Sequence, residues 1–434
     1  MPRQFPEIAL PAIPSTSGAA EKYDIIVITP LFGGGVKAGV NDAAMPIRAA
    51  SIRGQLRFWW RATRGAEYET FKEMLKAENA IWGATDTPSA VGARVRITNN
   101  GKSQRCAEFP PDKNFPKFVA EYPAYALFPF QGKKSREKGI EQQPAAGTRD
   151  IQFTLSLTYP QNWEYDYTRE VETALWAWIN FGGLGARTRR GCGVLFCAEL
   201  APKGADKIKE WFVGALEKYR IKFASAPRGW LTLSDKLLIK KSSTPMRCWD
   251  ETIRTYQQFR QGRDLGRNPP ATDSRSPAGR SRWTEPDAIR RITGQHNSKH
   301  FSSITGNENV FPRAEFGLPI IFHFQGGGDP QDTDLRPLID GKPQDRMGSP
   351  LILKPLMLDD GKNTTISIAL LMTAPELKEV VLLKTRDENK SYPVRSPAAA
   401  NYDKSPLKNR EPNGSALTGF LKFLTENNYT EVAR

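Results

Sequence analysis

Five arginines in a stretch without acidic residues are the first side chains of this sequence with the chemistry of a binding site. In residues 46–64 (PIRAASIRGQLRFWWRATR) they are Arg48, Arg53, Arg57, Arg61 and Arg64. On a helix, the last four would share an arc of roughly 80°. Like charges at this spacing repel, and an approaching phosphate relieves the repulsion because guanidinium groups bind phosphate oxygens well. The stretch predicts a phosphate-binding face. The alternative is a solvated basic face with partners elsewhere in the fold.

A glycine-rich segment is the second candidate. Residues 181–193 read FGGLGARTRRGCG, with five glycines and three arginines. Glycine lets the backbone approach a ligand and present its N–H groups. The segment lacks the Gly-Lys-Ser/Thr ending of a P-loop and the spacing of the dinucleotide-binding GxGxxG motif. We predict contact with an anion or with RNA; the alternative is an ordinary connector.

Apolar periodicity predicts the elements that position both segments. Strands are expected at residues 23–29, 93–98, 151–159 and 193–198. Helices are expected from Ser51, as N-cap, to about Gly65, and over residues 168–181. The core-facing stripe of the first helix would consist of Ile52, Leu56, Trp59 and Thr63. This order of elements predicts a ferredoxin-like domain with insertions.

The whole chain is predicted to be α+β, with two ferredoxin-like (RRM-like) domains, insertions and a glycine-rich loop. We expect a loose N-terminal segment (1–20), a first domain (21–225) and a second, diverged domain (226–434). Strands of the second domain are expected at residues 319–324, 350–356, 364–372 and 379–384, with a closing helix at 416–427. Exposed irregular segments are expected at residues 131–148 and 329–345, and a basic insertion at 262–300.

The net charge points to a polyanionic partner. Lys and Arg number 62 against 47 Asp and Glu, giving a formal charge of +15. Nucleic acid is the first expectation and an anionic membrane surface the second. No stretch reaches the ~18 apolar residues of a spanning helix, and no secretory signal is evident. Four cysteines without a Cys-x-x-Cys pair favour a reducing, cytoplasmic compartment.

Several stretches together form a recognisable set. They are TPLFGGG (29–35), PIR (46–48), SIRGQLRFWWR (51–61) and FGGLGARTRRG (181–191), with weaker support at 281–290, 316–320 and 346–351. With these motifs the chain resembles the RAMP superfamily, the repeat-associated proteins of CRISPR effector complexes. The resemblance is closest to the tail-end RAMP subunit of the type III-B (Cmr) effector.

The resemblance implies a non-catalytic subunit that binds single-stranded RNA. Such a subunit caps the complex near the 3′ end of the guide, contacts CRISPR guide RNA, target RNA or both, and adjoins other RAMP subunits. The second half has no equally clear glycine-rich loop, since GGG at 326–328 is a poor substitute. The expected RNA-binding residues are Arg48, Ser51, Arg53, Gln55, Arg57, Trp60, Arg61, Arg64, Gly182, Gly183, Gly185, Arg187, Arg189, Arg190, Gly191, Arg282, Arg290 and Arg291.

A metal-independent endoribonuclease is the rival hypothesis. Some RAMP relatives cut guide RNA with His, Tyr or Lys as general acid and base. The histidines available here are His296 and His300, expected in the exposed basic loop, and His323, expected to be packed within a strand. We expect no metal and no cofactor. A third reading, an anionic-membrane-binding protein, predicts liposome binding that RNA does not compete away.

Overall fold

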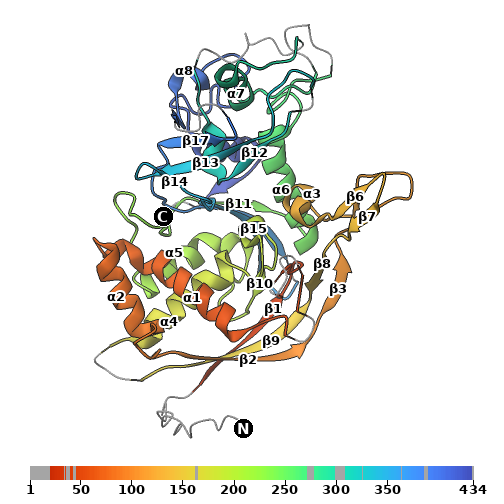
Figure 1. Ribbon diagram of the computed structural model, residues 1–434. Helices are drawn as coiled ribbons and strands as arrows, with labels where there is room; N and C mark the ends of the chain where they lie inside the picture. Colours follow the sequence, from red (N-terminus) through yellow and green to blue (C-terminus); the bar gives the residue numbers. More distant parts are fainter. Residues whose placement is uncertain are drawn as a thin grey trace, which may run out of the picture.

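The computed structural model describes residues 20–33, 35, 40–42, 45–161, 165–270, 278–298, 308–324, 326–362, 364–385 and 390–432. Apart from Ala20, the predicted loose segment lies outside these residues. Within them the structure mixes helices and antiparallel sheets, as the α+β prediction required (Figure 1). No helix of the described part is long and apolar enough to cross a membrane.

The first sheet has four strands in the order β10-β1-β9-β2, all antiparallel. Its strands are β1 (Glu21–Val27), β2 (Gly92–Asn99), β9 (Ile151–Thr158) and β10 (Leu195–Phe196). Its helices are α1 (Ala49–Arg64), α2 (Phe71–Trp82), α4 (Tyr167–Phe181) and α5 (Ile208–Lys218). Along β9 the odd-numbered residues are buried, which explains why α1 and α4 pack together on one face of this sheet (Figure 1).

The second sheet repeats this arrangement in the C-terminal half. Its order is β15-β16-β11-β19, again antiparallel. The strands are β11 (Leu237–Lys241), β15 (Leu351–Met357), β16 (Thr365–Leu371) and β19 (Thr430–Glu431), and the helices are α6 (Pro245–Gln261) and α9 (Ala416–Glu426). Both sheets therefore follow the chain order strand–helix–strand–strand–helix–strand, with the same neighbours in space.

A third sheet is inserted in the second domain, and the sequence did not predict it. It consists of β12 (Ile320–Phe322), β13 (Thr333–Ile339), β14 (Lys342–Pro343), β17 (Glu379–Leu383) and β18 (Ser391–Pro393), near α7 (Glu285–Thr293) and α8 (Pro397–Ala400). The strands predicted at 319–324 and 379–384 belong to this sheet, as β12 and β17. The prediction of a solvated loop over 329–345 is also wrong, because β13 buries Thr333, Asp334 and Leu335.

The first domain carries its own insertion between β2 and β9. It holds the short strands β3 (Lys102–Arg105), β4 (Ala107–Glu108), β5 (Lys117–Phe118), β6 (Lys133–Ser135), β7 (Gly139–Gln142) and β8 (Ala146–Arg149), and the helix α3 (Ala124–Leu127). The predicted irregular loop over 131–148 is thus the β6–β7 hairpin and β8, and the hairpin projects from the body of the protein (Figure 1).

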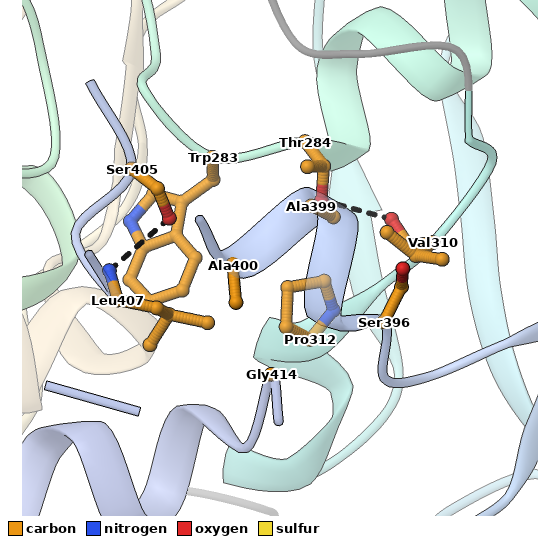
Figure 2. Close-up of a pocket in the computed structure, with 10 residues that line it drawn as sticks. All are labelled: Trp283, Thr284, Val310, Pro312, Ser396, Ala399, Ala400, Ser405, Leu407 and Gly414. Carbon is orange, nitrogen blue, oxygen red and sulfur yellow. Dashed lines mark hydrogen bonds between the residues drawn. The ribbon is translucent and has the colours of Figure 1, made fainter. Parts of the chain in front are cut away.

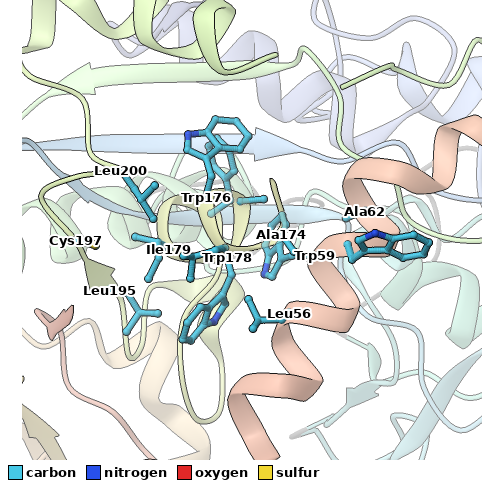
Figure 3. Packing of buried hydrophobic residues seen from close by; sticks show 14 of the residues in the cluster. Leu56, Trp59, Ala62, Ala174, Trp176, Trp178, Ile179, Leu195, Cys197 and Leu200 are labelled. Atoms are coloured by element: carbon cyan, nitrogen blue, oxygen red, sulfur yellow. The ribbon is translucent and has the colours of Figure 1, made fainter. Parts of the chain in front are cut away.

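The two domains share their cores through β15, every residue of which is buried. Ile352 and Leu356 join the core of the first domain, whereas Leu351 and Leu353 join a core with α6 and α9. Figure 3 shows the tryptophan-rich part of the first core, where Trp59, Trp176 and Trp178 pack among aliphatic side chains. The glycine-rich segment follows α4 and lies against β15, so the domain junction fixes its position.

Candidate nucleic-acid interface

The helix of the first arginine stretch begins before the predicted cap. It starts at Ala49 with Arg48 at the N-cap position, which makes no side-chain capping bond, so the assignment of Ser51 as cap is wrong. The predicted core stripe is confirmed, since all four of its residues are buried. Ser51 is exposed and Gln55 half-buried.

The arginines of α1 find acceptors on α2, the next helix. Arg57 Nε donates to Glu78 Oε1 at 2.6 Å, and Arg61 donates to the same oxygen at 2.7 Å. Arg53 bonds the main-chain oxygen of Trp82 at 2.6 Å. The Glu78 side chain has no exposed area, whereas Arg57 and Arg61 keep 27% and 32% of theirs. The repulsion along α1 is therefore relieved within the chain, as in the alternative interpretation.

Two predicted RNA-binding residues lie in the protein interior. Trp60 has no exposed area and donates its indole N–H to Glu170 at 2.7 Å. Arg64 is 4% exposed and pairs with Glu170 at 3.1 Å. Arg48, at the helix start, pairs with Asp42 at 2.8 Å. Burial leaves Trp60 and Arg64 no surface for a ligand, and we remove both from the candidate interface.

The glycines of the loop over 182–193 serve close packing. A Cβ at Gly185, where φ is +79°, would lie 2.5 Å from the Phe32 oxygen, and one at Gly191 would lie 2.6 Å from the Trp249 ring. The loop uses its main-chain donors internally, with bonds from the N–H groups of Gly182, Leu184, Ala186, Arg190, Gly191 and Gly193. These six N–H groups are therefore not presented to a ligand, whereas no such main-chain bond is formed by the N–H groups of Gly183 and of the exposed Gly185 in the described structure. Gly182 and Gly183 are buried as well.

Among the described residues, the loop arginines have no carboxylate partner, in contrast to Arg57 and Arg61 of α1. Arg190 donates to the Leu351 oxygen at 2.6 Å and to Ser349 Oγ at 3.0 Å, and Arg189 donates to the Ser349 oxygen. These acceptors are neutral and belong to the second domain. The two arginines thus fix the loop to the domain junction, and within the described residues neither of them forms an ion pair with a carboxylate.

Arg187 lies over an aromatic ring. Its guanidinium carbon is 5.2 Å from the centroid of Phe128, and its backbone adopts the left-handed conformation at φ 58°. Burial lowers the pKa of Arg187 and of Arg189 below the usual arginine value. Desolvation therefore opposes the positive charge, and an anion bound there would offset that cost.

These arginines line a cavity of about 760 Å³ between the loop, the first-domain insertion, α6 and β12. We call it the arginine cleft. Four arginines line it: Arg187, Arg189, Arg190 and Arg260. The lining also contains the aromatic side chains of Tyr125, Phe128 and Tyr256 and the aliphatic side chain of Ile321. Among the residues that the structure describes, no Asp or Glu lines the cleft. Four positive charges in an acid-free cavity of this size are suited to a phosphorylated ligand.

Sequence reasoning missed the contribution of α6. The Tyr256 hydroxyl accepts from Arg260 at 3.1 Å and lies 3.5 Å from an Arg190 nitrogen. Burial opposes ionisation of Tyr256, but Arg260 and Arg190 outweigh it and bring its pKa below the usual value for tyrosine. The signal in the sequence was the spacing of Tyr256 and Arg260, four residues apart on one helix face.

A second cavity continues the arginine cleft along the third sheet. It has a volume of about 600 Å³ and shares Arg260, Ile321 and His323 with the cleft. Its own arginines include Arg267, which is exposed, and Arg290, which is 6% exposed. Asp329 also lines this cavity and pairs with Arg290, so the second cavity is less strongly basic than the arginine cleft.

The three arginines predicted from the basic insertion have partners in the chain. Arg290 pairs with two buried aspartates at 2.9 and 3.0 Å. Arg282 bonds Asn268 at 3.1 Å, and Arg291 bonds a main-chain oxygen at 2.6 Å. Arg290 also lines the second cavity, whereas the other two line neither cavity.

His323 is the histidine that lines the cleft, and its expected packing within a strand is wrong. It follows β12, exposes 66% of its side chain, and places Nδ1 2.7 Å from Asp332 Oδ2. His296 lies in the described part, whereas His300 lies outside it. In the described part of the chain, no cluster of three or more His, Cys, Asp or Glu could hold a metal ion.

A smaller cavity lies away from these arginines. Figure 2 shows its lining by Trp283, Pro312, Leu407 and neighbouring small residues, with no charged side chain among them. Its volume is about 10 Å³, the space of a single water molecule. This cavity is a packing void and too small for a nucleotide.

Comparison with known proteins identifies the family. Residues 24–195 match the family model of the RAMP superfamily. Over 181 residues the chain is 33% identical to CRISPR system Cmr subunit Cmr1-2 of Pyrococcus furiosus, covering 40% of this chain and 92% of that protein. The chain therefore belongs to the RAMP superfamily. Within it, the chain is homologous to the Cmr1 subunits of the type III-B Cmr complex.

Other relatives cover different shares of the chain. Subunit Cmr1-1 of Pyrococcus furiosus is 29% identical over 150 residues, covering 34% of this chain and 39% of that protein. The crystal structure of Cmr1 from Pyrococcus furiosus in its apo form has a TM-score of 0.47 at 16% identity, covering 96% of this chain and 99% of that chain. A chain of the type III-B Cmr-beta complex bound to cognate target RNA has a TM-score of 0.44 at 12% identity, covering 82% and 94%.

Proposed function

We propose that this protein is a non-catalytic, RNA-binding subunit of a type III-B CRISPR effector in antiviral defence. It caps the complex near the 3′ end of the guide RNA, beside other RAMP subunits, and contacts guide RNA, target RNA or both. The observation that carries the proposal is the arginine cleft, whose described lining contains four arginines and no carboxylate. The relatedness to Cmr1 subunits supports the assignment to this complex.

The proposal includes two ferredoxin-like domains. Its support is the shared strand–helix–strand–strand–helix–strand order of both main sheets, with equivalent neighbours in space. The cleft lies where the first domain, its insertion and the second domain meet. RNA bound there would contact both halves of the chain.

Binding of single-stranded RNA tests the proposal. Arg260→Ala removes a cleft charge and should weaken binding and lower the slope of log affinity against log salt by about 0.7, the value for one phosphate contact on a single strand. Arg254→Ala is the matched control, because Arg254 is an exposed α6 arginine paired with Asp250 outside the cleft. Equal affinity and slope for Arg260→Ala and wild type would contradict the proposal.

The endoribonuclease hypothesis keeps one supporting observation. His323 lines the cleft and is hydrogen-bonded to Asp332, an arrangement that fixes an imidazole for general acid–base chemistry. The test is incubation of the purified chain with CRISPR-repeat RNA in EDTA. We expect intact RNA; cleavage that His323→Ala abolishes would instead establish the nuclease.

Position within the complex needs a separate measurement. Co-purification from the native host followed by sequencing of the bound RNA should recover CRISPR guides together with other RAMP subunits. Footprinting of the guide should then show protection near its 3′ end that disappears when this subunit is omitted. Protection at the 5′ end alone would contradict the capping position.

A further inference from the structure

The arginine cleft contains an exposed aromatic ring, Phe128, which lies beside the guanidinium of Arg187. Phe128 is 55% exposed, although its neighbours Leu127 and Phe130 are buried at 0% and 7%. Phe130 stacks on Phe32 with ring centroids 4.7 Å apart and an angle of 8° between the planes. These two anchors hold the backbone on either side of Phe128, so its ring is presented to the cleft by a rigid support.

The guanidinium beside this ring retains an unused donor. Arg187 lies over the Phe128 ring, and its buried Nε has no hydrogen-bond partner in the described structure. The Nε atom itself is closed to solvent, so a phosphate would meet the terminal nitrogens of this half-buried guanidinium, for which phosphate oxygens are strong acceptors. The pair thus places an exposed apolar ring beside a cation that lines the cleft.

A second exposed apolar side chain lines the cleft. Ile321 on β12 is 52% exposed and lines the same cavity. A cavity of about 760 Å³ falls within the ~300–1,000 Å³ typical of organic-ligand sites. Apolar and cationic side chains in one cleft match the two parts of a nucleotide, which are a flat base and an anionic phosphate.

We propose that the arginine cleft holds an unpaired nucleotide of RNA, with its base stacked on Phe128 and its adjacent phosphate on Arg187. The inference rests on the proposed function and adds the ligand class of the site. In a duplex, both faces of a base are covered by its neighbours, so stacking on Phe128 selects single-stranded RNA. Every base has a π face, so the site should tolerate any sequence.

Two substitutions separate stacking from charge. Phe128→Ala should weaken binding of single-stranded RNA about 5- to 150-fold, the effect of losing one base–aromatic stack, without a change in salt slope. Phe128→Trp should preserve affinity, because tryptophan also offers a stacking face. Arg187→Ala should instead lower the salt slope by about 0.7.

The matched control is Phe115→Ala. Phe115 belongs to the same insertion and is 81% exposed, but it lies outside the arginine cleft. We expect wild-type affinity for this variant and weak binding of duplex RNA by every variant.

Three outcomes would overturn the inference. Wild-type affinity of Phe128→Ala would remove the stacking role while the proposed function stands. Loss of subunit co-purification in Phe128→Ala, with RNA affinity unchanged, would show that a protein segment occupies the cleft. Absence of RNA binding by the wild-type chain would overturn both the inference and the proposed function.

Discussion

Lys354 provides a sharp test of how the glycine-rich loop is held. This lysine lies in β15, has no exposed area, and donates to the main-chain oxygens of Gly182 at 2.8 Å and Ile179 at 3.4 Å. These carbonyls end α4, where the helix dipole favours a cation. Within the described residues it forms no ion pair with a carboxylate, and burial lowers its pKa to about 7.

The sign of the pH effect follows from linkage. An unfolded lysine keeps its proton to about pH 10.4, whereas the folded protein loses it through about pH 7. The unfolded state therefore binds more protons between these values, and stability rises with pH. With one pKa unit worth about 1.4 kcal/mol and half the proton already lost at pH 7, the rise from pH 7 to 8.5 is about 1.5 kcal/mol.

The measurement compares wild type with Lys354→Met by urea unfolding at pH 7.0, 7.5, 8.0 and 8.5. The difference in unfolding free energy should change by about 1.5 kcal/mol in favour of wild type as pH rises. Methionine matches the lysine stem in size and cannot titrate. A pH-independent difference between the two proteins would refute the account of a buried, titrating lysine.

Two further predictions concern the elements around the cleft. Glu78→Gln removes the shared partner of Arg57 and Arg61 and breaks a buried ion pair, so it should lower stability by about 3 kcal/mol in urea unfolding. The affinity for single-stranded RNA should stay within about twofold of wild type. A large change in affinity would show that the arginines of α1 contact RNA. Gly185→Val should lower the free energy of unfolding by about 1–3 kcal/mol, because its Cβ would lie 2.5 Å from a backbone oxygen. Gly54→Ala, in open space on α1, should raise the free energy of unfolding by about 0.5–1 kcal/mol, measured by thermal unfolding. A Gly185→Val protein more stable than the Gly54→Ala protein would contradict the packing role of the loop glycine.

Local patterns predicted β1, β2, β9, α1 and α4, but not α2, α5 or the short strands of the insertion. Strand β9 alternates along its whole length, and the apolar stripe of α1 repeats at helical spacing, so both could be recognised without tertiary information. The third sheet was missed because its strands pair over long stretches of chain; Asp334 of β13, for example, pairs with Leu383 of β17. A local pattern gives a strand but not the sheet to which it belongs.

The site was harder to predict because residues far away in the sequence decide whether an arginine is buried in an ion pair or exposed to a ligand. Arg64 looked like a surface arginine, but its carboxylate partner, Glu170, lies 106 residues away. Conversely, Arg260 became a cleft residue only because α6 packs beside the glycine-rich loop. The loop itself was located correctly, since a glycine-rich turn with three arginines is a strong local signal.

Photo-crosslinking tests the central claim most directly. Single-stranded RNA carrying 4-thiouridine is bound to the full chain, irradiated, and the attached peptides are identified by mass spectrometry. RNA bound in the arginine cleft predicts crosslinks to the first-domain insertion around Phe128, to the loop at 187–190 and to α6 near Tyr256. Crosslinks confined to the outer face of α1, with the cleft peptides unmodified, would contradict it.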